Sequence, residues 1–421
     1  SEDNAGAGFS MSNMGQTYWT LGEYDNAIES HFKAIELREK ATDRKGQAYS
    51  WSKLGDLYKE SGDLKKALDA FTTSIKLYEE IGDKKAVAGI YNNLGGTYLN
   101  GKDYFKAIEY YEKAKDLYKN IESRIDLAST LTDLGYAYYN IKQYDTAANY
   151  FHNSLEVQKD IDDKAGQFYN YINLGSIEQN NKLSFTDAEA YYNDAFTIAN
   201  EIESKSLIAY SYKTFGYLHS ARGQIEETID KHNKALALYS EIEETGSVAE
   251  IKIDLGYDYT FKGSFDVAEK YFREAQEIAE VINNRDLISQ ALNGIGQLKR
   301  MMGDFPASLD LINQSLKLSE EVDNLWNMSG IYLNYGNTYN AMGHYTTAIH
   351  YYNLTDSIYQ ITDNEFSRAT PINNIGTIYY WQKDYEKAKK QFEEAHKIID
   401  IPGNNSEFMS ILKVNIGEIH Y

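Results

Sequence analysis

The sequence of 421 residues contains no cysteine, only three prolines and no long apolar run. The absence of cysteine excludes disulfides, thiolate chemistry and cysteine-ligated metal sites. The scarcity of proline favours long helices, because proline interrupts a helix interior. A membrane-spanning helix needs about 18 consecutive apolar residues, and we therefore expect no insertion into a membrane.

Basic residues are outnumbered by acidic residues, 42 against 63, and the formal net charge is −21. Nucleic acids and anionic membrane surfaces attract basic patches, so we expect neither as a partner. The acidity has two interpretations: it keeps an elongated molecule soluble, or it attracts a basic segment of a partner protein. No signal peptide is recognisable, and we expect a cytoplasmic protein, although a chain without cysteine also tolerates the periplasm. The oligomeric state is left open.

Motifs of catalysis are also missing. The eight histidines share no metal-ligand spacing, and two of them, His31 and His232, stand at a helical position that Phe71 and Phe272 occupy in other repeats. There is no phosphate-binding loop, dinucleotide fingerprint, zinc-protease motif or nucleophile elbow. We therefore expect no enzymatic activity, no catalytic residue, no cofactor and no metal site.

What is present is a repeat of 40 or, at two steps, 41 residues. Its most regular feature is a glycine that follows a large residue. We call these residues the anchor glycines and number other positions from them, so that +1 is the next residue. They are Gly15, Gly55, Gly95, Gly135, Gly175, Gly216, Gly256, Gly296, Gly336, Gly376 and Gly417. They define ten repeats and the first half of an eleventh.

Each repeat contains two segments with helical spacing of apolar residues, separated by a break that often contains a second glycine. Such a glycine ends a helix in a left-handed turn. The breaks with glycine in register are at Gly22, Gly62, Gly223, Gly263, Gly303 and Gly343. The anchor glycine lies inside the first segment, where it costs about 1 kcal/mol relative to alanine. We infer that it allows a neighbouring helix to approach closely, and we predict an all-α solenoid in which helical hairpins stack on one another. Residues 1–8 are expected to be a linker, and 9–421 one continuous array.

The recurring Leu-Gly, Tyr, Gly, Tyr or Phe, and Ala resemble the tetratricopeptide repeat over almost the whole chain, as in "NNLGGTYLNGKDYFKAIEYYEKA" at 92–114. The usual period is 34 residues, and the longer period is similar to that of the LGN/Pins adaptors, the kinesin light chains and the bacterial Rap regulators. The resemblance implies a right-handed superhelix whose first helices line a concave groove.

The resemblance also implies that asparagines at position −2 face this groove and bind the backbone of a peptide. A carboxamide can donate and accept at once, as a peptide group requires. The alternative is that these side chains bond neighbouring helices of the array. The residues are Asn13, Asn93, Asn173, Asn334, Asn374 and Asn415, with Asp133 and Asp254 at the same position elsewhere.

Aromatic residues at +1, +4 and +5 are expected on the same face. They are Tyr136, Tyr217 and Tyr257 at +1, Trp19, Tyr139 and Tyr380 at +4, and Phe261 and Trp381 at +5. They form either a binding surface, since aromatic residues dominate binding hot spots, or part of the packing. Basic residues are few on this face (Lys59, Lys213 and Arg300), so we do not expect the clamp with which chaperone-binding relatives hold a terminal carboxylate.

The leading hypothesis is a non-enzymatic scaffold that binds a peptide or a helix of a partner protein in the groove. A second hypothesis is a sensing input domain of a larger bacterial signalling protein, suggested by a sequence that stops within a first helix, at "LKVNIGEIHY". A third, less favoured, is a peptide-responsive regulator similar to Rap, because the helical bundle that precedes the Rap repeats has no counterpart here.

Overall fold

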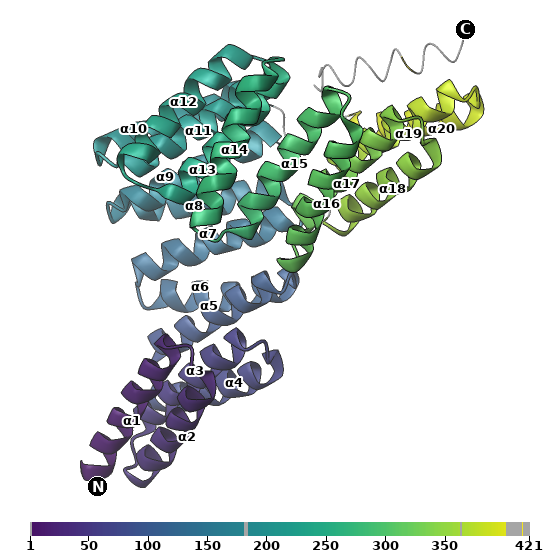
Figure 1. Cartoon of the computed structure of the whole chain (residues 1–421). Helices are drawn as coiled ribbons and strands as arrows, with labels where there is room; N and C mark the ends of the chain where they lie inside the picture. The colour runs from purple at the N-terminus through teal and green to yellow at the C-terminus, as the bar shows by residue number, and fades with distance from the viewer. Residues whose placement is uncertain (1, 181–183, 363, 401–414, 416–421) are drawn as a thin grey trace. The chain divides into compact units, whose positions relative to one another are not determined.

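The computed structural model describes residues 2–180, 184–362, 364–400 and 415. These residues form twenty α-helices, one short 3-10 helix and no strand. The predicted all-α array of repeating hairpins is confirmed (Figure 1). Gly417 and most of the expected eleventh half-repeat lie outside the described residues.

The first helices of the hairpins carry odd numbers and the second helices even numbers. The first helices are α1 (Glu2–Thr20), α3 (Arg44–Glu60), α5 (Lys84–Asn100), α7 (Arg124–Asn140), α9 (Lys164–Asn180), α11 (Lys205–Ala221), α13 (Thr245–Phe261), α15 (Arg285–Met301), α17 (Leu325–Ala341) and α19 (Ala369–Trp381). The second helices are α2 (Tyr24–Lys40), α4 (Leu64–Ile81), α6 (Tyr104–Asn120), α8 (Tyr144–Asp160), α10 (Phe185–Glu201), α12 (Ile225–Glu241), α14 (Phe265–Val281), α16 (Phe305–Glu321), α18 (Tyr345–Ile361) and α20 (Tyr385–Ile399).

The chain divides into two compact units, with the boundary between Ile177 and Glu178. In the first unit, α2, α4 and α6 each pack against their own first helix and against the first helix of the next hairpin. In the second unit, α10, α12, α14, α16 and α18 each pack against the following first helix. The boundary lies in a repeat that departs from the common pattern. There Glu178 stands at +3, a position that is tyrosine in seven of the repeats.

Helix α1 begins at Glu2, so residues 2–8 are part of the first hairpin and not the linker that the sequence suggested. Gly8 explains this difference. It lies against Arg38 of α2, and a Cβ at residue 8 would be 2.7 Å from the Arg38 Cγ. A segment rich in alanine and glycine can therefore continue the helix, because α2 approaches it closely at Gly8.

The glycines of the breaks have the left-handed conformation that the sequence predicted. The six glycines named above have φ between 73° and 82°. Where a break has no glycine, lysine can adopt the same conformation, as at Lys102, Lys142 and Lys383. The backbone geometry of the turn is thus conserved between repeats even though the residue is not.

The anchor glycines bring the two helices of a hairpin together, as predicted. A Cβ at Gly135 would lie 2.4 Å from the ring of Phe151, and one at Gly336 would lie 2.4 Å from the ring of Tyr352. In both pairs the ring belongs to the residue 16 positions later, on the second helix. The ring packs directly on the backbone of the first helix, and this contact compensates for the low helix propensity of glycine.

We expect the substitution Gly135→Ala to lower the free energy of unfolding by about 1–3 kcal/mol, because a Cβ would overpack a core position whose Phe151 ring is buried. Gly89→Ala is the matched control. Its Cβ would be 3.6 Å from the nearest atom, the Tyr118 hydroxyl oxygen, so helix propensity alone should stabilise it by up to about 1 kcal/mol. Native-state hydrogen exchange of the amides in α5 and α7 measures both variants, and a stabilised Gly135→Ala would contradict the packing argument.

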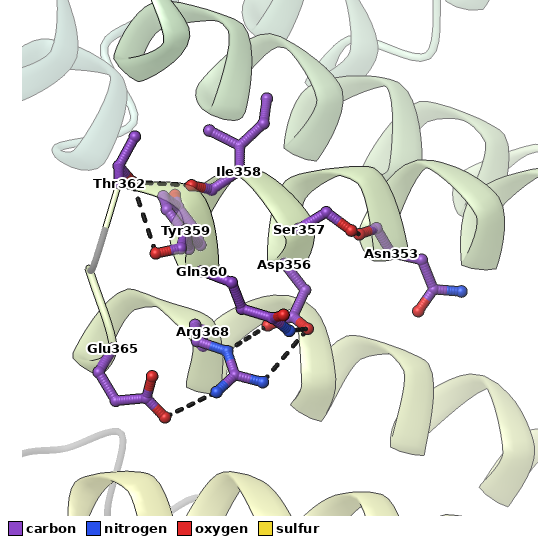
Figure 2. A network of polar contacts seen from close by, with 9 residues as sticks. All are labelled: Asn353, Asp356, Ser357, Ile358, Tyr359, Gln360, Thr362, Glu365 and Arg368. Carbon is purple, nitrogen blue, oxygen red and sulfur yellow. Dashed lines mark hydrogen bonds and ion pairs between the residues drawn. The ribbon is translucent and has the colours of Figure 1, made fainter.

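The last complete hairpin begins irregularly. Pro371 lacks the N–H that would bond the carbonyl of residue 367, and the chain there forms the 3-10 helix η1 (Phe366–Arg368) before α19. Arg368 holds this segment against α18: its Nε donates to the Asp356 Oδ1 at 2.7 Å and its Nη1 to the Glu365 Oε1 at 2.7 Å (Figure 2). These ion pairs thus hold the residues before α19 at the point where the other first helices have a regular first turn.

Candidate functional site

The second unit contains a hollow of about 440 Å³ on the face formed by α11, α13 and α15. Most of its lining residues stand at +1, +4 or +5, the positions that the sequence analysis places on the groove face. The lining residues are Ser220, Gly223, Ile225, Tyr257, Asp258, Thr260, Phe261, Gln297 and Met301. Two of these residues, Tyr257 and Phe261, were predicted from the sequence to lie on the groove face, and Gly223 was named there as a break glycine.

Apolar side chains surround the opening of this hollow. Phe261 and Met301, both at +5, expose 75% and 43% of their surface. Trp381 stands at the same position of α19 and exposes 55%. Tyr257 is held in place by its edge-on contact with the ring of Phe272, at a centroid distance of 5.0 Å. Large apolar side chains are therefore exposed to the solvent at position +5 of α13, α15 and α19.

One lining residue of the hollow, Asp258, is paired with a buried histidine. The Nδ1 of His232 on α12 is 2.6 Å from the Oδ2 of Asp258 on α13. Because a carboxylate accepts, we assign the imidazole proton to Nδ1. The Nε2 of His232 is buried and has no partner among the described residues. His232 does occupy the packing position inferred from the sequence, and its partner Asp258 also lines the hollow.

A second carboxylate, Asp254, lies one helical turn before Asp258. The hydroxyl of Tyr217 donates to the Asp254 Oδ2 at 2.8 Å. Burial raises the pKa of Asp254, while the charge of Lys213 opposes this rise. Lys213 is itself paired with Glu250 at 2.8 Å. Lys213 thus acts on two carboxyl groups of α13, Glu250 and Asp254.

Other members of the predicted asparagine row in the second unit bond to neighbouring first helices. The Nδ2 of Asn334 donates to the Asn293 Oδ1 at 2.9 Å, and that of Asn374 donates to the Asn337 Oδ1 at 3.3 Å. Asn415 donates to the Asn373 Oδ1 at 3.0 Å. These bonds correspond to the alternative interpretation, in which the amides link helices of the array.

In the first unit the row is divided between bonded and exposed members. Asp133 accepts a bond from Asn92 at 3.4 Å, and burial raises the pKa of Asp133 to about 6. Asn173 shares a bond with the hydroxyl of Tyr136, 2.9 Å from its Nδ2. Asn13 and Asn93 are exposed, and neither side chain has a bonding partner within the part of the chain that the structure describes.

The remaining predicted aromatics combine packing with exposure. The Trp19 Nε1 donates to the Glu60 Oε2 at 2.6 Å. Tyr139 packs edge-on against Tyr144, and Tyr380 packs in the same way against Tyr385. Tyr136 and Tyr217 also contact buried rings of their own second helices, yet both keep part of their surface exposed. The structure thus brings Tyr217, Asp254 and Tyr257 together on one face and distributes the other predicted residues along the two units.

Arg300 is the cation of this face that has no carboxylate partner among the described residues. Its Nε is buried without a hydrogen bond, and burial lowers the pKa of its guanidinium. Asn340 stands at the same position, +4, on the next first helix, and its Oδ1 is also buried without a partner. An unpaired guanidinium can donate several hydrogen bonds to carbonyl or carboxylate oxygens of a ligand.

Sequence reasoning missed Asp258, Gln297 and Met301. Asp258 carried a recognisable signal: the residues at +2 of the other complete repeats are leucine, isoleucine, threonine or alanine. Asp258 thus stands at a position where the other repeats have apolar residues or threonine. One repeat earlier, His232 stands at a position that is aromatic in other repeats, and the two together predict a buried pair. Gln297 and Met301 gave no comparable signal, because neutral side chains are common on this face.

Neither a metal centre nor a membrane-spanning helix lies within the described residues. No group of three or more histidine, aspartate or glutamate side chains is arranged to hold a metal ion there. None of the helices in those ranges combines the length and the apolar character that crossing a bilayer requires.

Comparison with protein families identifies tetratricopeptide repeats over more than half of the chain. One family model with this description matches residues 8–80, 86–160 and 247–321, and two others match 329–358 and 369–399. No curated protein matches the sequence.

Among solved structures, a Rap protein complexed with competence and sporulation factor has a TM-score of 0.53 and 17% identity, covering 86% of this chain and 99% of that chain. Yeast Tom70 has a TM-score of 0.49 and 14% identity, covering 98% of this chain and 96% of its own. The apo form of RapI has a TM-score of 0.49 and 16% identity, covering 66% of this chain and 98% of its own. At such identities the likeness concerns the fold alone.

Proposed function

We propose, because the chain belongs to the tetratricopeptide repeat family, that it is a non-enzymatic scaffold that binds a peptide segment of a partner protein. The observation that carries this proposal is the hollow of about 440 Å³ between α11, α13 and α15, with Phe261 and Met301 exposed at its rim. Large apolar groups that gather around a concavity are typical of binding sites.

Polar groups next to the hollow suit a peptide chain. Arg300 lies beside Met301 in the sequence and can donate to backbone carbonyl groups of a ligand. In the first unit, Asn13 and Asn93 are the exposed members of the asparagine row, and we assign them a similar role toward the backbone. The members that already bond to neighbouring helices are assigned to the positioning of those helices.

Selection from a displayed library of random peptides against the purified chain tests this proposal. We expect the selected peptides to bind 10–30 times more weakly to Phe261→Asp and to Met301→Asp, because a charge in an apolar contact removes a binding hot spot of about 2 kcal/mol. Isothermal titration calorimetry with the selected peptides measures this change.

Val281→Asp is the matched control for this experiment. Val281 ends the second helix α14 and exposes 84% of its surface, so the same chemical change is made on an apolar residue outside the hollow. Its affinity should stay within about twofold of the original chain. A library that yields no binder, or an equal loss in all three variants, would refute the scaffold proposal for this face.

A further inference from the structure

We infer that the hollow between α11, α13 and α15 is a specificity pocket for a basic side chain, lysine or arginine, of the bound segment. This inference rests on the proposed function and deepens it. It names the chemical group that the pocket selects and the carboxylate, Asp258, that receives it.

The lining of the pocket favours a cationic group. Its side chains with polar atoms are those of Ser220, Tyr257, Asp258, Thr260 and Gln297, and no lysine, arginine or histidine is among the nine lining residues. The hydroxyl of Thr260 already donates to the carbonyl of Gly256 at 2.7 Å. A ligand group in this pocket therefore meets one carboxylate and several oxygens that can accept hydrogen bonds, which suits a donor-rich cation.

Asp258 is nearly buried and exposes only 8% of its surface. Its Oδ2 accepts from His232, and its Oδ1 has no partner within the described parts of the chain. The Nδ1–H of His232 can make this bond in the uncharged imidazole, so the bond itself requires no positive charge on the ring. A nearly buried carboxylate with an unfilled oxygen favours a cation with hydrogen-bond donors.

The lysines next to this part of α13 already have carboxylate partners. Lys213 is paired with Glu250 at 2.8 Å, and Lys262 is paired with Glu226 at 2.8 Å. Among the described residues, neither Asp254 nor Asp258 forms an ion pair with a lysine or arginine, and the charge of Lys213 acts on both Glu250 and Asp254. The net charge of −21 acts in the same direction, because it attracts cationic segments before contact is made.

The shape of a lysine or arginine side chain also suits the pocket. Lysine and arginine carry long hydrocarbon stems below their charged groups, and such stems pack on apolar surface while the head remains solvated or paired. Ile225, Phe261 and Met301 offer this surface at the rim. A guanidinium or ammonium that passes them reaches Asp258, with Ser220 and Gln297 as further acceptors.

The test uses N-acetylarginine amide as the probe and N-acetylcitrulline amide as its neutral counterpart of nearly the same shape. Binding is followed by the methyl resonance of Met301 in the full chain labelled at its methionine methyl groups, assigned with Met301→Leu. We expect the arginine probe to shift this resonance with an affinity at least 10-fold higher than that of the citrulline probe.

Asp258→Asn should remove this difference between the probes. Its amide oxygen can still accept from His232, so the fold is retained while the charge is lost. Asp266→Asn, at an exposed residue of α14 outside the pocket, should leave the difference unchanged. Gln297→Lys, which places an ammonium group in the pocket, should abolish the response to arginine.

Equal affinities of the two probes, or an arginine preference that persists in Asp258→Asn, would overturn the inference. These failures are distinct from a failure of the proposed function. A peptide library that yields binders sensitive to Phe261→Asp would still support the scaffold even if arginine and citrulline bind alike. Conversely, an arginine preference that depends on Asp258 would support the pocket even if no library peptide is selected.

Discussion

The substitution Phe272→Ala is expected to lower the free energy of unfolding by about 3–5 kcal/mol. Phe272 is fully buried, and its ring lies between two glycines of neighbouring first helices. A Cβ at Gly256 would be 2.6 Å from this ring, and one at Gly294 would be 2.4 Å from it. No side chain at these two positions can move into the space that the ring leaves, so the cavity should remain largely open.

Native-state hydrogen exchange of the amides in α13 and α15 measures the expected loss, because a long repeat array does not unfold in a single two-state step. Phe261→Ala is the control. It removes the same side chain from an exposed position and should change the free energy of unfolding by less than about 0.5 kcal/mol. Similar small effects of both substitutions would show that the glycine-lined contact around Phe272 contributes little to stability.

The substitution His31→Phe is expected to stabilise the first hairpin, and to do so most strongly at acidic pH. His31 is fully buried, and neither ring nitrogen has a partner among the described residues. Its ring packs on Gly15 in the same way that Phe71 packs on Gly55, so phenylalanine fits this position. At neutral pH, removal of two unsatisfied ring nitrogens should contribute about 1 kcal/mol.

The pH dependence follows from the protonation of the imidazole. Burial, with the charges of Lys53 and Arg38, lowers the pKa of His31 from 6.5 to about 4. The unfolded chain therefore binds a proton that the folded chain excludes as pH falls from 6.5 to 4, and the folded state loses about 3 kcal/mol over this range. In His31→Phe this loss should be absent. Native-state hydrogen exchange of the amides in α1 and α2 at pH 7.5, 5.5 and 4.5, compared with the original chain at each pH, measures the difference.

His232→Phe, at the equivalent position of the sixth repeat, should have the opposite effect. His232 bonds to Asp258, and phenylalanine would leave this carboxylate buried without its partner. We expect a loss of about 1–3 kcal/mol at neutral pH. If both substitutions stabilise the chain, the His232–Asp258 pair is not a stabilising contact.

The contrast between the two histidines marks the limit of prediction from the sequence. Both were recognised as packing residues, because phenylalanine occupies the same position in other repeats, at Phe71 and Phe272. The residue 26 positions later, on the next first helix, is Leu57 for His31 and Asp258 for His232. The bond between His232 and Asp258 depends on how two successive hairpins pack, which periodicity within one helix does not specify.

By itself the sequence determined the helices, their pairing into hairpins, the left-handed glycine turns and the close contact at the anchor glycines. These features depend on local periodicity and on the missing side chain of glycine, and both are readable within one repeat. Only the tertiary structure decided which polar residues are available to a ligand. Asn93 and Asn334 occupy the same position of the repeat, yet Asn93 is exposed while Asn334 is buried in a bond with Asn293. The reason is physical: the partner of each side chain comes from a neighbouring helix about 40 residues away, and its identity varies from one repeat to the next.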